Sequence, residues 1–137
     1  MKMTEKDVEI LESIQKYCEK IASTVNRFGN NYGMFDMDDD YKDSISMNIL
    51  QIGELSRKLS NEFSQESKSD VDWSSARAMR NLFAHAYDSM DSYVIWNTVQ
   101  KDIPKLYMFC KQQLQIAYDN NIGIKDDNND DWDMEMK

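Results

Sequence analysis

Apolar residues recur every three or four positions in four long stretches of the chain, which is the pattern of amphipathic helices. The first stretch covers about six turns, with Thr4 as a plausible N-cap and Asp7 in the third helical position as an imperfect capping box. Gly29 follows as a C-terminal stop. The stripe consists of Val8, Leu11, Ile14, Cys18, Ile21, Val25 and Phe28. It predicts one long helix, followed by a polar loop over residues 30–40.

A second helix is predicted from about Asp40 to Phe63. Gly53 interrupts a segment whose other residues favour a helix. A glycine inside a helix costs about 1 kcal/mol relative to alanine, so we expect it to permit a close approach by another helix. The polar segment 64–71 is predicted to be a loop. The apolar stripe of this second helix consists of Tyr41, Ile45, Ile49, Ile52, Leu55 and Leu59.

Two further helices complete the pattern. Asp72 can cap a third helix that begins at Trp73 and runs to about Tyr87, and a fourth begins near Ser89 or Asp91. Pro104 must kink or split this last helix, because it removes a backbone donor and clashes with the preceding turn. The sequence therefore predicts an all-α fold over residues 1–120. The expected architecture is an antiparallel four-helix up-and-down bundle whose last helix is kinked.

Charge is unevenly distributed along the chain. The formal net charge is −9, of which residues 126–137 contribute −5, and we interpret residues 121–137 as an acidic C-terminal tail outside the bundle. RNA-binding proteins are usually basic, so the overall acidity argues against binding by broad electrostatics. The segment 74–87 is nevertheless free of acids and contains Arg77 and Arg80. An anion site is expected there.

Composition also indicates the compartment and limits the chemistry. No stretch is apolar for long enough to span a membrane, and the N-terminus leads into no signal-peptide core, so we expect a cytoplasmic protein. Cys18 and Cys110 lie at apolar helical positions and are interpreted as reduced core thiols, with a disulfide or a reactive thiol as the alternative. With one histidine and no clustered His–Cys spacing, neither a metal site nor a cofactor is predicted.

The third helix separates apolar from polar positions. With 100° per residue, its core face consists of Ala76, Met79, Leu82, Phe83 and Ala86. Its polar residues and Ala84 fall about 100° or more away and are predicted to face outward: Arg77, Arg80, Asn81 and His85. By spacing alone, a lone histidine such as His85 is usually an ordinary surface or capping residue. Arg80 could equally form an ion pair, Asn81 a buried helix-to-helix hydrogen bond, and Tyr87 could be a core aromatic at the helix end.

The same residues also suit RNA cleavage without a metal. Histidine is the side chain whose ordinary pKa suits acid–base work near neutrality, which makes His85 the candidate acid or base. Arg80 can hold a phosphate through two parallel hydrogen bonds, with Arg77 as a further RNA contact, and Asn81 can orient either group. One histidine does not easily act as both acid and base, whereas a two-fold homodimer would supply a second.

The segment from Arg80 to Tyr87 resembles the HEPN superfamily and, within it, the HepT-like toxins. Their hallmark is Arg, four residues, His, one residue, Tyr, which Arg80, His85 and Tyr87 match, and Asn81 matches the usual residue after the arginine. The resemblance covers residues 5–118. It is reinforced by Ile52-Gly53-Glu54, by Trp73, and by Trp96 followed by Asp102-Ile103-Pro104-Lys105-Leu106, in which Ile103 replaces the commoner leucine.

The resemblance implies a helical homodimer with a cleft between its two motif helices. It implies a toxin that is a metal-independent endoribonuclease acting on tRNA or mRNA. It also implies a cognate nucleotidyltransferase antitoxin of the MntA type, which transfers AMP onto the motif tyrosine, here Tyr87. Bulk and negative charge added beside Arg80 would oppose RNA binding. The alternatives are a non-catalytic nucleotide- or RNA-binding subunit of such a transferase, which the acidic composition favours, and a scaffolding bundle.

Overall fold

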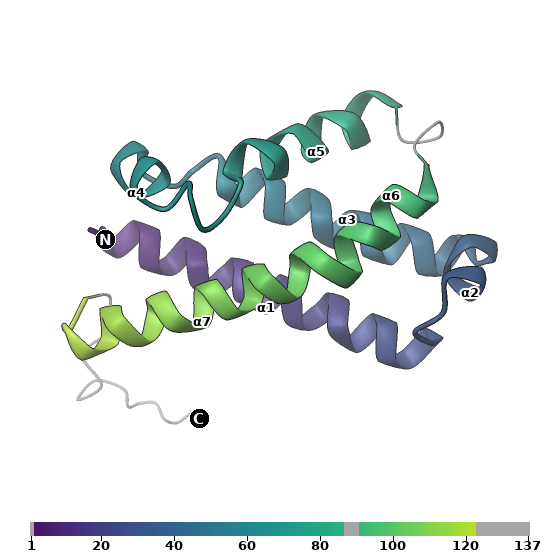
Figure 1. The fold of residues 1–137 in the computed structure, drawn as a ribbon, viewed down its shortest axis with the longest axis horizontal. Helices are drawn as coiled ribbons and strands as arrows, with labels where there is room; N and C mark the ends of the chain where they lie inside the picture. The colour runs from purple at the N-terminus through teal and green to yellow at the C-terminus, as the bar shows by residue number, and fades with distance from the viewer. Residues whose placement is uncertain (1, 87–90, 123–137) are drawn as a thin grey trace.

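Four long helical segments run alternately up and down the molecule (Figure 1). The structure, a computed structural model, describes residues 2–86 and 91–122, and of residues 81–86 only the backbone. The segments are α1 (Glu5–Phe28), α3 (Asp39–Ser56), α5 (Trp73–Ala86) and the consecutive helices from Ser92 to Asp119. The described residues contain no strand. The predicted all-α antiparallel bundle is therefore confirmed.

The start of α1 is fixed by more contacts than its sequence signal indicates. The Thr4 hydroxyl accepts from the Asp7 backbone N–H at 2.9 Å, and the Asp7 carboxylate accepts from the Thr4 N–H at 3.1 Å, so the capping box is complete. Asp7 also accepts from the backbone N–H of Ser60 at 2.7 Å and from its hydroxyl at 2.6 Å. One fully buried carboxylate thus joins the N-termini of α1 and of α4 (Asn61–Glu66).

Two short helices correct the predicted boundaries. The segment expected to be a loop over residues 30–40 contains α2 (Tyr32–Met37), because the Asn31 side chain caps it and Phe35 is buried. The predicted helix from Asp40 to Phe63 instead ends at Ser56. The Ser60 hydroxyl then accepts from the Phe63 N–H at 3.2 Å and begins α4, so a local side-chain cap outcompetes continuation of the apolar stripe.

The last helical segment is interrupted, as the single proline predicted. It consists of α6 (Ser92–Asn97), a π-helical turn η2 (Thr98–Asp102) and α7 (Ile103–Asp119). Pro104 lies in the first turn of α7, directly after the π-helical turn, where the Ile103 N–H donates to the Thr98 carbonyl five residues back. Val99 in this turn and Ile103 after it are both buried.

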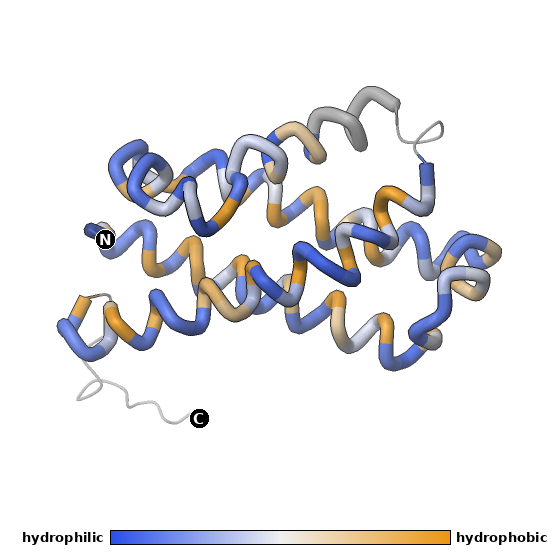
Figure 2. The backbone as a smooth tube through the Cα atoms, in the orientation of Figure 1, coloured by the Kyte–Doolittle hydropathy of each residue, from blue (hydrophilic) through white to orange (hydrophobic). Residues whose placement is uncertain are grey.

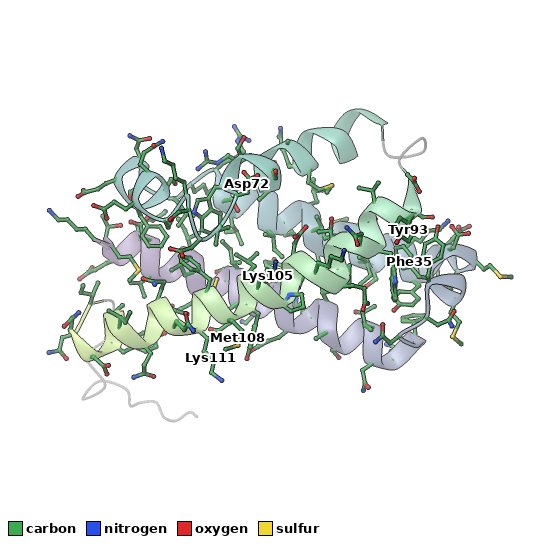
Figure 3. All side chains as sticks on the ribbon, viewed as in Figure 1. Phe35, Asp72, Tyr93, Lys105, Met108 and Lys111 are labelled. Atoms are coloured by element: carbon green, nitrogen blue, oxygen red, sulfur yellow. The ribbon has the colours of Figure 1, made fainter. Side chains whose placement is uncertain are left out.

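The core lies around α1, which packs against α3 on one side and α7 on the other, while α5 packs chiefly against α3. Apolar residues recur along the facing sides of these helices in Figure 2. At the α2 end of the bundle, aromatic rings pack together, and Figure 3 marks this region with Phe35 and Tyr93. The fully buried apolar side chains include Val8, Leu11, Ile14, Phe35, Tyr41, Ile45, Phe63 and Cys110.

The two cysteines are buried, unpaired core thiols, as predicted. Burial raises the pKa of Cys18 to about 12, with a smaller contribution from Glu19, and burial likewise raises the pKa of Cys110. None of the helices in the described ranges is long and apolar enough to cross a membrane.

Candidate active site on helix α5

Helix α5 is anchored at its first turn. Asp72 caps it by accepting from the backbone N–H of Ser75 at 3.0 Å and from its hydroxyl at 2.7 Å. The Trp73 ring is buried, packs edge-on against Phe109 and donates from Nε1 to the Ser67 hydroxyl at 2.8 Å. The cap and the tryptophan together fix where α5 begins and how it lies on the bundle.

Helices α3 and α5 approach each other closely at Gly53. A Cβ atom at this position would lie 2.8 Å from the Arg80 Cβ and 2.9 Å from the Ala76 carbonyl oxygen. Both distances are far shorter than van der Waals contact, so only glycine fits without moving the helices apart. The predicted role of Gly53 is confirmed, and the residue it admits is Arg80.

Glu54, the neighbour of Gly53, forms an ion pair with Arg80. Its Oε2 atom accepts from the arginine Nε. The hydrogen bond from Arg80 holds the pKa of Glu54 below its usual range, against a smaller opposing effect of desolvation, so Glu54 is ionised at neutral pH. The Arg80 side chain is 32% exposed and the Glu54 side chain 34% exposed. The prediction that Arg80 faces outward is therefore corrected, because the side chain lies against α3.

Arg77 is likewise turned toward the bundle. It is half-buried, and its NH2 group donates to the Ser56 carbonyl at 3.3 Å and to the Ser64 hydroxyl at 3.1 Å. Its buried Nε atom has no hydrogen-bond partner in the part of the chain that the structure describes. Arg77 thus ties the end of α3 to α4. Its predicted contact with RNA stays a prediction that this geometry does little to support.

Arg57 is the residue that sequence reasoning missed. It follows the last residue of α3, and its NH1 atom lies 3.4 Å from Glu54 Oε1. Lys58 is the next residue, and both side chains are exposed. The available signal was the spacing: Arg57 stands three residues after Glu54, which places the two side chains on one helix face. Arg57 therefore reaches the same carboxylate that accepts a hydrogen bond from Arg80.

The remaining predicted site residues are only partly placed. Asn81 and His85 both belong to α5, which carries them on the same helix as Arg80. Their side chains are not among those the structure describes, and Tyr87 lies outside the described residues, as does most of the acidic tail. The backbone thus confirms that Arg80, Asn81 and His85 share one helix, and their roles remain predictions.

The other side of α5 borders a cavity of about 230 Å³. Its floor is apolar and includes Ile52 from α3, while its rim carries Asp70, Asp72 and Asp102 together with Lys105. Asp72 and Lys105 are labelled in Figure 3. Three carboxylates against one ammonium group make this rim unfavourable for a phosphate. The favourable surface for an anion is therefore the arginine side of α5. Among the described residues, no group of His, Cys, Asp and Glu could hold a metal ion.

Comparison with known proteins identifies the family. The model of the family described as "Ribonuclease HepT-like" matches residues 14–113, which include most of α1, all of α5 and most of α7. The chain belongs to the HepT-like ribonuclease family. The matched range contains every candidate site residue of this HepT-like chain described so far, from Gly53 on α3 to His85 on α5.

Named relatives agree with this assignment. A protein of Caldanaerobacter subterraneus subsp. tengcongensis, described by inference as an RNase, is 31% identical to the HepT-like chain over 105 residues, covering 77% of this chain and 91% of the relative. A protein of Methanocaldococcus jannaschii described in the same way is 31% identical over 92 residues, covering 61% of this chain and 80% of the relative. A protein of Thermococcus cleftensis, described by inference as a ribonuclease HepT, is 38% identical over 55 residues, or 40% and 49% of the two chains. No solved structure was found to match the chain.

Proposed function

We propose that this chain is the toxin of a bacterial toxin–antitoxin pair, a metal-independent endoribonuclease that cuts tRNA or mRNA. The observation that carries the proposal is the fixed position of Arg80. Gly53 admits its Cβ against α3 and Glu54 accepts a hydrogen bond from its Nε, so the guanidinium is oriented before substrate arrives. Preorganised cations of this kind stabilise charge that develops in a transition state.

The proposed reaction uses α5 from two subunits. A base removes the proton of the ribose 2′-hydroxyl, the 2′-oxygen forms a bond to phosphorus, and the bond from phosphorus to the 5′-oxygen breaks as an acid protonates that oxygen. The products are a 2′,3′-cyclic phosphate and a 5′-hydroxyl end. His85 of one subunit serves as base and His85 of the second as acid, Arg80 balances the charge on phosphate, and Asn81 orients the reacting groups.

Regulation is proposed to act on the residue that follows this helix. A cognate MntA-like nucleotidyltransferase would transfer AMP onto Tyr87, two residues beyond His85, and the added phosphate would repel RNA from Arg80. Intact mass measurement of protein co-expressed with the transferase tests this. An increment of one or more AMP units that is lost in Tyr87→Phe is the expected result, and an increment that persists in that variant contradicts it.

The test of catalysis is His85→Ala, assayed on total RNA in EDTA. We expect the variant to keep wild-type helical content and mass in solution and to lose both cleavage and growth inhibition. A folded His85→Ala protein that still cleaves RNA, or that still arrests growth, would contradict the mechanism. Arg27→Gln at the end of α1 is the control, because it removes one exposed charge away from α5.

A second candidate is a non-catalytic RNA- or nucleotide-binding subunit of a nucleotidyltransferase. The net charge of −9 favours it, because a nuclease that holds RNA electrostatically is usually basic. The same assay separates the two. Wild-type protein that binds RNA in EDTA and yields no fragments ending in cyclic phosphate would favour the binding subunit.

A further inference from the structure

Two of the four arginines in the chain contact one carboxylate, and a third reaches the nearby end of α3. Arg80 contacts Oε2 of Glu54 and Arg57 contacts Oε1, so each oxygen of Glu54 faces a different guanidinium. Arg77 ties Ser56, the last residue of α3, to α4. The basic cluster, defined as Arg57, Lys58, Arg77 and Arg80, therefore gathers at the junction of α3 and α5.

Positive charge exceeds negative charge in the immediate surroundings of Glu54, among the residues that the structure describes. Arg57 and Arg80 both contact this carboxylate and Lys58 follows Arg57, in a chain whose net charge is −9. The ion pairs place the charges of Arg80 and Arg57 beside Glu54, and Arg80 first, then Arg57 and Lys58, lower the pKa of Glu54. A polyanion approaching this acidic protein is attracted here, because local fields rather than net charge decide where it docks.

Within the cluster, Arg57 is the side chain best placed to bind a ligand. Its separation of 3.4 Å from Glu54 exceeds the roughly 2.7–2.9 Å of a strong charge-assisted bond, and its side chain is 51% exposed. Arg77, by contrast, is half-buried and bonded to Ser56 and Ser64. The hydrogen bond from Arg77 to the Ser56 carbonyl holds the backbone directly before Arg57. The Arg57 side chain therefore starts from a fixed backbone position, while the side chain itself is exposed.

We infer that Arg57, assisted by Lys58, binds a second phosphate of the RNA, next to the one held by Arg80. The inference rests on the proposed function, since it extends the same site along the substrate backbone. Glu54 then sets the spacing of two phosphate sites, because it contacts one arginine with each oxygen. Arginine suits this role, since its planar fork matches phosphate geometry. The substrate class that follows is an RNA of several nucleotides, whose backbone continues from Arg80 toward the end of α3.

The experiment compares Arg57→Gln and Lys58→Gln with the control Arg27→Gln, which removes the same charge from the far end of α1. Cleavage of a labelled RNA oligonucleotide in EDTA gives kcat and KM, and binding to His85→Ala protein at several salt concentrations gives the salt slope. We expect Arg57→Gln to raise KM about tenfold with little change in kcat. The slope should fall by about 0.7, the value for one phosphate contact on a single strand. Arg57→Lys should recover most of the slope.

The outcomes are distinct from those of the proposed function. If the wild-type protein cleaves RNA and Arg57→Gln matches it in KM and salt slope, the second phosphate site is wrong and the nuclease stands. A fall in kcat alone would also overturn it, since Arg57 would then act only through Glu54 and Arg80. If the wild-type protein binds RNA without cutting it, the salt slope still decides for or against Arg57. If it binds no RNA, both proposals fail.

Discussion

Replacing Gly53 with alanine should damage catalysis more than stability. The new Cβ would start 2.8 Å from the Arg80 Cβ and 2.9 Å from the Ala76 carbonyl oxygen. Ordinary contact begins near 3.4 Å, so α3 and α5 must separate by about 0.6 Å at this point. Neither neighbour can rotate away, because one is a backbone atom and the other is the first atom of its side chain.

The two consequences of Gly53→Ala differ in size. Overpacking costs about 1–3 kcal/mol, whereas alanine regains about 1 kcal/mol of helix propensity, so the net loss of stability should be about 1 kcal/mol. The displaced helix carries Arg80 with it. Since a misplacement of about 1 Å in an active site can cost about 100-fold in rate, we expect cleavage to fall by roughly 10- to 100-fold.

Urea unfolding and initial rates of RNA cleavage in EDTA, measured on the same preparations, check both values. Gly33→Ala in α2 is the matched control, because among the described residues its added Cβ would meet only the Asn31 side-chain oxygen, at 3.1 Å. That variant should keep wild-type cleavage. A Gly53→Ala protein that cleaves within about twofold of wild type would refute the argument that the α3–α5 contact positions Arg80.

The remaining predictions concern two helix caps and the core thiols. Asp7→Ala should lower the free energy of unfolding by about 2 kcal/mol, because Asp7 serves two helix starts, whereas Asp72→Ala should cost about 1 kcal/mol. Burial raises the pKa of Asp7, but hydrogen bonds from Ser60 and Thr4 outweigh it and leave the pKa below 3.8. The stabilisation by Asp7 is therefore complete above about pH 4 and is lost as the pH falls through the folded-state pKa. Urea unfolding between pH 2 and 6 should show this loss. An Asp7→Ala protein with the same urea midpoint as wild type would contradict the prediction. Cys18 and Cys110 should react with a thiol reagent at neutral pH only at the rate of unfolding, and rapid labelling of folded protein would show that they are accessible.

The sequence predicts the long helices well and the short ones poorly. The stripe that ends at Phe28, the Asp72 cap and the Pro104 interruption all depend on local rules, and the structure agrees with them. The helix break before Ser60 depends on a competition between a side-chain cap and an apolar stripe that continues to Phe63. Such a competition is decided by tertiary contacts, here the bonds from Ser60 to Asp7, which periodicity does not reveal.

The candidate site likewise combines features that local spacing predicts with tertiary contacts that it does not. Helical spacing correctly separates Arg80 from the apolar face that includes Met79, but it leaves open what the polar side contacts. The structure supplies α3 as that contact, and with it Glu54 and Arg57. Residues that meet across two helices more than 20 positions apart have no periodic signature, so the contact between Glu54 and Arg80 could not be predicted, whereas the three-residue spacing of Glu54 and Arg57 could have been used.

The link between Asp7 and Ser60 has a consequence for how the chain assembles during synthesis. The carboxylate closes a loop of 53 residues by accepting hydrogen bonds from the Ser60 backbone and hydroxyl, and every residue in that loop precedes α5. Chains emerge from the ribosome N-terminus first, so α1 and α3 can be joined before α5 has been made. The helix that carries Arg80 and His85 then docks onto a surface where Gly53 and Glu54 are already in place. Removing the first seven residues would therefore disturb the packing of α3, and with it the surface onto which α5 docks.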